Sequence, residues 1–362
     1  MKKNHIKLND NEIDISKSDP NSSLLDWIRL EQQLHGTKEG CAEGDCGACS
    51  ILLSPVNGGK LRPANSCLLK LGQVVGSSVY TVEGLGSKKL PSPIQKSLTK
   101  YGGSQCGFCT PGFVIAITSL LNHKEKPTEI DIHDALAGNL CRCTGYRPIV
   151  EAIEKIDGDI HLPKYSKWSK CMNSISETAN FFYPASVEEA YELSYKNDNT
   201  FYLSGGTDLN LSEISPSIKP NYILLNRIPS LNTIHEKNNE IHIGASVTLE
   251  DTLPYFEKFF PPFAEIIRRF GSSQIRSQAT IAGNLCTASP IGDTAPSLMA
   301  LGASVEIFSN KKFKYLAVED LFTDYRKTVL NPNDIITSII IPLPENEKFY
   351  YCLLYTSDAA DE

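Results

Sequence analysis

GCAEGDCGAC, residues 40–49, is the stretch from which the fold of the first part of this chain follows. It holds Cys41, Cys46 and Cys49 in a C-x4-C-x2-C spacing, and Cys67 follows after a predicted strand and turn. This unequal spacing is typical of a loop that wraps a two-iron, two-sulfur cluster. The four cysteines therefore predict a first [2Fe–2S] site.

The glycines of this stretch agree with that chemistry. A two-iron cluster needs converging thiolates and backbone N–H groups aimed at its sulfides, so the chain must turn tightly around it. Gly40, Gly44 and Gly47 permit backbone conformations that residues with a Cβ resist. The loop is thus expected to approach the cluster with its main chain.

A second set of four cysteines lies further along. Cys106 and Cys109 occur in QCGFC, and Cys141 and Cys143 occur in CRC, with two helical segments predicted between the pairs. If those helices fold back as a hairpin, each pair supplies one side of a second cluster. We expect Cys141 and Cys143 to face Cys106 and Cys109.

Two other uses of these cysteines have to be weighed. Two distant pairs of close cysteines often bind structural zinc, which would make the chain a zinc-stabilised binding or adaptor protein. The glycine content and unequal spacing of residues 40–49 favour iron–sulfur clusters. Disulfides are the weakest alternative, because the N-terminal MKKNHIKLND does not resemble a secretory signal. A cytoplasmic protein is expected.

The composition is that of an ordinary soluble chain. It has 362 residues, of which 41% are hydrophobic and 21% charged, and a formal net charge of −7. That length allows two or three domains. The acidic balance disfavours a nucleic-acid partner, and no apolar run approaches the ~20 residues of a membrane span.

Residues 1–85 are predicted to form a small β-rich domain. HIKLND and NEIDIS indicate a hairpin, and 51–53 and 66–71 indicate strands that lead from and into cluster ligands. SLLDWIRLEQQL predicts a helix that stops at Gly36. Its candidate caps are Asn21, Ser22 and Ser23, and its candidate core residues are Leu24, Leu25, Trp27, Ile28 and Leu30.

Residues 88–160 are predicted to be helical. Proline is favoured in the first helical turn, and the expected helix starts contain Pro91, Pro111, Pro127 and Pro148. The apolar run PGFVIAITSLL predicts a buried helix beside the second cluster. A polar stretch, 161–178, reads as an interdomain linker, and its single Cys171 is assigned no role.

Residues 179–351 are predicted to form an α/β domain with two glycine-rich loops. FYLSGGTDLNL places Ser204 to Asp208 after a strand, and residues 275–293 carry IRSQATIAGNLCTASPIGD. Backbone N–H groups of such loops can cradle a pyrophosphate. Because G-x-G-x-x-G is missing, a Rossmann fold is not predicted.

Taken together, GCAEGDCGAC, QCGFCTPGF, GNLCRCTGYRPI, SGGTDL and QATIAGNLCTASPIGD resemble the xanthine dehydrogenase family of molybdenum hydroxylases. The likeness runs to about Tyr351 and is to the bacterial small subunit that carries two [2Fe–2S] clusters and FAD. It implies an α+β multidomain fold: a β-grasp ferredoxin-like domain, a helical [2Fe–2S] domain and a FAD-binding domain of the vanillyl-alcohol-oxidase/CO-dehydrogenase-flavoprotein type.

The resemblance also implies which residues contact FAD. Gly205 to Thr207 would meet the phosphates, Asp293 could accept a hydrogen bond, and Phe270 would lie against the flavin or the adenine. Gln105 matches a position that links the helical-domain cluster to the molybdopterin of a partner. The full implied FAD set is Tyr202, Leu203, Ser204, Gly205, Gly206, Thr207, Asp208, Leu209, Phe270, Thr280, Ile281, Ala282, Gly283, Asn284, Asp293 and Ile336.

The implied function is electron transfer within purine catabolism. Electrons would leave a molybdopterin-bearing large subunit, pass through the two clusters to FAD and reach NAD+ as the expected acceptor. No catalytic residue for hydroxylation is expected in this chain. A small subunit of a related aldehyde or N-heterocycle hydroxylase remains the alternative, because substrate choice belongs to the partner.

The C-terminal string CLLYTSDAADE, residues 352–362, departs from the family. The same string results from translating a transposase adapter used in DNA library preparation, so a non-native tail is expected. The natural chain would then be longer, and a family lysine near the flavin falls where Leu354 stands. Weaker flavin retention and an exposed apolar surface are expected from the missing C-terminal domain.

Overall fold

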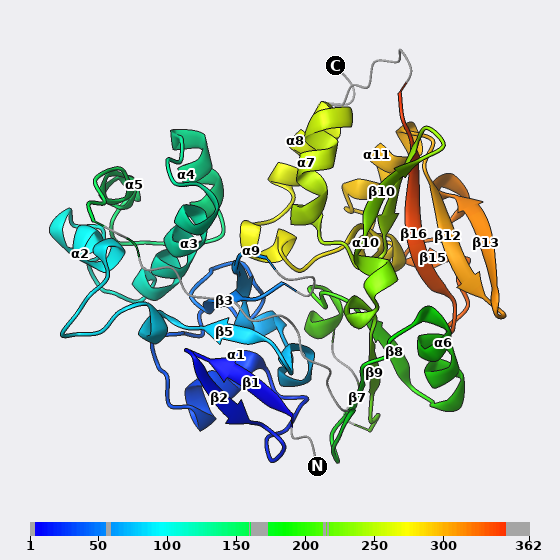
Figure 1. Ribbon diagram of the computed structural model, residues 1–362, viewed down its shortest axis with the longest axis horizontal. Helices are drawn as coiled ribbons and strands as arrows, with labels where there is room; N and C mark the ends of the chain where they lie inside the picture. The colour runs from blue at the N-terminus through cyan, green and yellow to red at the C-terminus, as the bar shows by residue number, and fades with distance from the viewer. Residues whose placement is uncertain are drawn as a thin grey trace.

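The computed structural model describes residues 4–55, 59–158, 160, 173–212, 215 and 217–344. Three units follow one another along the chain in Figure 1: an N-terminal unit with strands β1 to β5, a helical unit with helices α2 to α5, and a C-terminal unit from β6 to β16. The mixed α+β architecture expected from the sequence is confirmed.

The N-terminal unit is built on a five-stranded sheet with the order β2-β1-β5-β3-β4. The expected hairpin is present, and Asn9 and Asp10 turn it with φ angles of 47° and 68°. Two left-handed residues in succession give the turn twist that an antiparallel hairpin favours. The strands are β1 (His5–Leu8), β2 (Asn11–Asp14), β3 (Ser50–Leu53), β4 (Arg62–Asn65) and β5 (Ser78–Tyr80).

The helix expected after Ser23 is present but shorter than predicted. Ser23 caps α1 (Leu24–Asp26) by accepting a hydrogen bond from the backbone of Asp26, and a π-helical turn follows over Trp27–Glu31. Trp27 is buried as expected, whereas Leu30 is 68% exposed, so its assignment to the core was wrong. Leu30 lies within the π turn, whose wider geometry takes its residues out of the α-helical phase.

The strand expected over 66–71 is also wrong. Ser66–Leu68 and Leu71–Val74 form 3₁₀ turns, and the neighbouring strand is β4. The hydroxyl of Ser66 donates to the carbonyl of Cys49 at 2.7 Å, which draws the chain in against the cysteine loop. An extended strand could not make that local contact and also turn Cys67 toward Cys49.

The helical unit has the expected proline punctuation with two corrections, because Pro91 and Pro127 each precede a cap residue and lie outside the helix they were expected to start. Its first helix begins at Pro93, after the cap Ser92, and not at Pro91. Phe113 and Ile117 are fully buried, which confirms that the apolar run forms an interior helix. The helices are α2 (Pro93–Lys100), α3 (Thr110–His123), α4 (Glu129–Leu136) and α5 (Arg147–Glu154).

The C-terminal unit contains two larger sheets, with orders β6-β7-β9-β8 and β10-β11-β16-β12-β13. In the first sheet, β7 (Asn180–Phe182) and β8 (Thr200–Leu203) both run parallel to β9 (Asn221–Leu224). Its other elements are β6 (Ser174–Ile175) and α6 (Val187–Lys196).

The second sheet is covered on one face by helices in yellow and gold in Figure 1. Its strands are β10 (Ile234–Lys237), β11 (Glu240–Gly244), β12 (Ser304–Ser309), β13 (Lys312–Ala317) and β16 (Ile335–Pro342), and β14 (Phe322–Asp324) pairs with β15 (Lys327–Thr328). The helices are α7 (Leu249–Phe259), α8 (Pro261–Arg269), α9 (Ser273–Arg276), α10 (Ile281–Thr287) and α11 (Thr294–Ala300).

Some sequence predictions fall outside the described residues. They include most of the expected linker, the tail 352–362 and the position of Leu354. Among the helices that are described, none has the length and apolar character needed to cross a membrane.

The core of the second sheet supplies a test of packing. Phe256 is fully buried, and its ring centroid lies 4.5 Å from that of Phe263. Phe256→Ala should lower the free energy of unfolding by about 3–5 kcal/mol, because it leaves a cavity where an aromatic ring packs. Urea unfolding followed by circular dichroism measures this. Tyr325→Ala, at a side chain that is 69% exposed, should change it by less than about 0.5 kcal/mol.

Candidate functional site

The first four cysteines form two pairs. The sulfurs of Cys49 and Cys67 lie 3.3 Å apart, close enough for one metal atom to contact both. The backbone N–H of Cys46 donates to the sulfur of Cys41 at 3.4 Å, and the two thiols are hydrogen-bonded. The loop before β3 supplies three of these residues, and the 3₁₀ turn after β4 supplies Cys67.

The second four cysteines also form two pairs. The thiols of Cys106 and Cys143 are hydrogen-bonded, as are those of Cys109 and Cys141. Cys109 immediately precedes α3, and Cys141 lies in the loop between α4 and α5. The helices α3 and α4 pack together, and this packing brings the two loops to the same end of the helical unit.

In each pair of thiols, one pKa is lowered and the other is raised. The hydrogen bond with Cys67 lowers the pKa of Cys49, and the same bond, with burial, raises the pKa of Cys67. Burial raises the pKa of Cys109 to about 12. Burial opposes ionisation of Cys141 too, but hydrogen bonds with Thr144, Cys109 and Cys143 together outweigh it and lower that pKa. One low and one high pKa in a pair is what two sulfurs sharing one proton produce.

The paired arrangement of the thiols bears on which metal group they can hold. Within the described residues, no three Cys, His, Asp or Glu side chains converge on a point that could hold a single metal ion. A structural zinc site needs four ligands around one ion. Two thiolates on each of two irons is the arrangement of a [2Fe–2S] cluster. The paired donor sets therefore fit two-iron clusters.

Glycine is sterically required in the first loop. A Cβ on Gly40 would lie 2.7 Å from the sulfur of Cys46. Gly47 has φ of +67°, and a Cβ there would lie 2.2 Å from the carbonyl oxygen of Gly138 in the helical unit. The main chain of the first thiol loop thus touches the helical unit directly. The N–H of Leu140 donates to the carbonyl of Cys46 at 3.0 Å across this contact.

The two glycine-rich loops of the C-terminal unit lie against each other. A Cβ on Gly205 would be only 2.0 Å from the carbonyl oxygen of Gln278, so the two main chains are in contact. The hydroxyl of Thr287 donates to the carboxylate of Asp208 at 3.4 Å. The structure therefore brings residues 204–208 together with the segment that begins α10.

Several predicted flavin contacts have side chains that point elsewhere. The Tyr202 hydroxyl donates to Ser194 and to the carbonyl of Asn333, so this side chain faces α6. Phe270 packs against the core of the second sheet, at the end of α8. The remaining side chains buried in hydrophobic cores are Leu203, Ile281, Ala282 and Ile336. At most of these predicted contacts the side chain is packed in a core, so only the main chain can face the two glycine-rich loops.

Except for Thr280, which is buried, the polar members of the set lie nearer the surface. Thr280 caps α10 by accepting from the N–H of Gly283 at 3.0 Å. Asn284 accepts a hydrogen bond from Thr294, and exposed Asp293 precedes α11. Gly206, with φ of +73°, Thr207 and Leu209 are half-buried. The meeting of two tight main-chain turns with small polar side chains fits the phosphates of a nucleotide.

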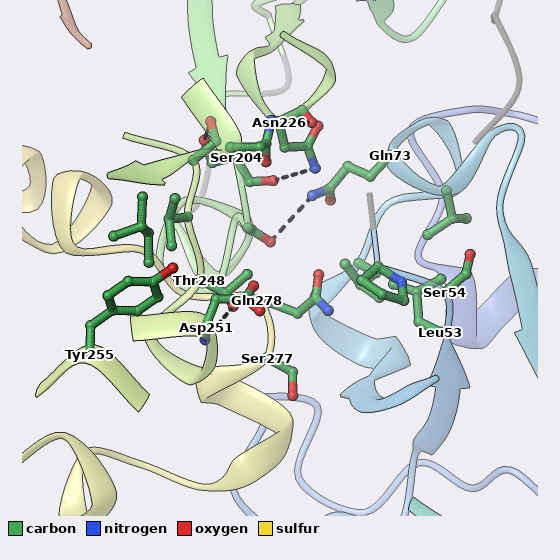
Figure 2. Close-up of a pocket in the computed structure, with 18 residues that line it drawn as sticks. Leu53, Ser54, Gln73, Ser204, Asn226, Thr248, Asp251, Tyr255, Ser277 and Gln278 are labelled. Atoms are coloured by element: carbon green, nitrogen blue, oxygen red, sulfur yellow. Dashed lines mark hydrogen bonds between the residues drawn. The ribbon is translucent and has the colours of Figure 1, made fainter. Parts of the chain in front are cut away.

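A cavity of about 220 Å³ lies behind these loops, between the N-terminal and C-terminal units (Figure 2). Gln73 donates to the carbonyl of Gly205 and Asn226 donates to that of Ser204, both at 3.3 Å. The cavity touches only Ser204 and Gly205 of the predicted flavin contacts. The predicted nucleotide contacts therefore lie mostly outside this cavity. Nothing in the sequence around Gln73 indicated that it supports this loop from another unit.

Comparisons with known proteins agree with both kinds of site. Residues 81–154 match a family described as a [2Fe–2S] binding domain, and residues 175–344 match the FAD binding domain in molybdopterin dehydrogenase. The xanthine dehydrogenase of Oryza sativa subsp. japonica is 33% identical over 407 residues, which cover 88% of this chain and 30% of that protein. The xanthine dehydrogenase/oxidase of Gallus gallus is 30% identical over 420 residues, covering 92% and 31%.

Among solved structures, reconstituted CO dehydrogenase from Oligotropha carboxidovorans is similar with a TM-score of 0.44 and 25% identity, over 47% of this chain and 61% of that one. The matched domains and the paired thiols define an iron–sulfur flavoprotein. The chain belongs to the xanthine dehydrogenase family of molybdenum hydroxylases, a family of oxidoreductases. It spans about 30% of the length of the curated relatives it matches.

The ligand assignment can be tested one cysteine at a time. Cys49→Ser and Cys109→Ser should each remove about half of the iron and acid-labile sulfide, because each variant breaks one set of four thiolates. Iron and sulfide analysis of anaerobically purified protein measures this. Cys286→Ser, outside both sets, should retain the full content. Equal iron in all three variants would contradict the assignment.

The contact between the glycine-rich loops has its own test. Gly205→Ala should weaken FAD binding at least about tenfold, because the added methyl group forces the loops apart in a close-packed region. Fluorescence titration of the flavin-depleted protein with FAD measures the affinity. Gly302→Ala, in a turn with no atom within 4 Å of the added Cβ, should lower stability but leave FAD affinity unchanged.

Proposed function

We propose that this chain is the electron-transfer part of a xanthine dehydrogenase-like molybdenum hydroxylase, taking electrons from a molybdopterin-bearing partner and delivering them to NAD+. The observation that carries the proposal is the series of contacts between the two thiol sets and the glycine-rich loops. Leu140 bonds to Cys46, and Asn210, in the C-terminal unit, donates to the carbonyl of Leu68 at 2.7 Å. Leu68 is the neighbour of Cys67 in the chain.

The outer face of the helical unit supports a partner at the entry to this series. Cys106 and Cys143 are exposed, whereas Cys141, in the inner pair, is buried. Beside the thiol ligands in the chain, Phe108 is 47% exposed and Leu140 is 56% exposed. Exposed apolar side chains beside redox ligands fit a surface that another protein covers.

The residues of this chain bind and separate the redox groups. The inner thiol pair lies beside the buried helix α3, which excludes water from that side of the second thiol set. The loops at 204–208 and 280–284 offer main-chain and hydroxyl groups to an anionic cofactor. When bound, FAD accepts electrons singly from iron–sulfur centres and passes them on in pairs as hydride.

The proposal is tested by spectroscopy on the anaerobically purified chain. The absorption spectrum should show iron–sulfur and flavin bands that bleach with dithionite. After removal of excess dithionite, adding NAD+ should restore the oxidised bands and form NADH. A colourless folded protein would overturn the electron-transfer role. Bleaching without NADH formation would overturn NAD+ as the acceptor and leave the rest.

A further inference from the structure

The three units meet at two buried side-chain amides. Gln274, on α9 of the C-terminal unit, is 1% exposed, and Asn139, in the helical unit, is 2% exposed. Figure 1 shows α9 reaching toward the helical unit above β3 of the N-terminal unit. Neither residue belongs to the thiol sets or to the glycine-rich loops. An amide is costly to bury unless its hydrogen bonds are made, so the partners of these two are informative.

Three hydrogen bonds of the two amides join segments that carry thiol ligands, and Gln274 Oε1 also accepts a bond from Ser273. Gln274 Nε2 donates to Asn139 Oδ1 at 2.9 Å and to Ser50 Oγ at 3.3 Å, and Ser50 follows Cys49 in the chain. Asn139 Nδ2 donates to the carbonyl of Gly47 at 3.2 Å, and Gly47 follows Cys46. Asn139 itself lies two residues before Cys141. The two amides thus connect both thiol loops to the C-terminal unit, which carries the glycine-rich loops.

The two amides are closely packed by their surroundings. A Cβ on Gly138 would lie 2.2 Å from Gln274 Oε1, and a Cβ on Gly112 would lie 2.8 Å from Asn139 Nδ2. Because Gly112 and Gly138 have no side chain, the two amides can pack directly against the main chain at these positions. A hydrogen-bonded polar group in a close-packed site favours one arrangement of the segments around it.

We infer that Gln274 and Asn139 are positioning residues that hold the two thiol loops at one fixed separation. Through the same hydrogen bonds, that separation is coupled to the position of the C-terminal unit. The consequence for electron exchange between the two sets rests on the proposed function. The mechanical role does not, because it depends only on the hydrogen bonds among Gln274, Asn139, Ser50 and Gly47.

Another contact between units provides a matched control. Arg62 pairs with Asp251 at 2.6 Å and also joins the N-terminal unit to the C-terminal unit. It binds no residue of either thiol loop: its partners are Asp251 and Thr248. Arg62→Met therefore loosens the same two units without touching the thiol loops.

The first measurement is hydrogen exchange of the full chain, purified anaerobically. The reporter is the Leu140 amide, which bonds to Cys46 across the two thiol loops. Gln274→Met keeps the length of the side chain and removes its donors. It should speed exchange of the Leu140 amide about tenfold, because Asn139 and Ser50 lose their buried donor. Arg62→Met should leave this exchange within about twofold of the parent protein.

The second measurement is electron paramagnetic resonance of the dithionite-reduced protein. In Gln274→Met, the magnetic interaction between the two reduced clusters should weaken while each cluster's own content stays unchanged, and Arg62→Met should match the parent. If Gln274→Met does not accumulate, Asn139→Asp replaces it, since it keeps the shape but loses the donor to Gly47.

Exchange and magnetic interaction that match the parent in the folded Gln274→Met or Asn139→Asp protein would overturn the inference. So would an equal response in Arg62→Met, which would show general loosening. A parent protein without clusters would sink the proposed function. The exchange measurement would still decide whether the two amides hold the loops.

Discussion

The arrangement of this protein depends on direct main-chain contact between two loops that carry thiols. Gly47 in the first loop touches the backbone of Gly138, and Leu140 donates to Cys46 at 3.0 Å. No side chain separates the loops at this point, because Gly47, Gly112 and Gly138 each leave room only for a hydrogen atom. Everything that positions one thiol set therefore positions the other.

That contact explains how the C-terminal unit is seated. Its helix α9 places Gln274 in the corner formed by the two loops, and Asn210 bonds to Leu68 beside Cys67. The same unit is also held by Gln73, which supports the backbone of Gly205 from the N-terminal unit. The first glycine-rich loop is thus positioned by residues far away in the chain. A change in the N-terminal unit can therefore alter flavin binding.

Much of the candidate site could be predicted because cysteine spacing and glycine are strong local constraints. The eight cysteines group into four pairs, and the loops at 204–208 and 275–293 come together. The exact behaviour of single side chains could not be predicted. Leu30 is exposed because a π turn shifts the helical phase, and Tyr202 faces α6 because its hydroxyl finds partners there. Such outcomes depend on neighbours that are distant in sequence.

The sequence by itself determined the chemistry: which residues can bind iron and which loops suit a nucleotide, because ligand type and backbone freedom are local properties. It also determined the main helices and the hairpin through caps, prolines and turn residues. Only the tertiary structure decided which thiols pair, which pair faces outward and how Gln274 and Asn139 join the three units. The thiol pairs arise from packing between separate loops, and the Gln274 contacts join segments more than a hundred residues apart, where hydrogen bonds and steric contact select one arrangement.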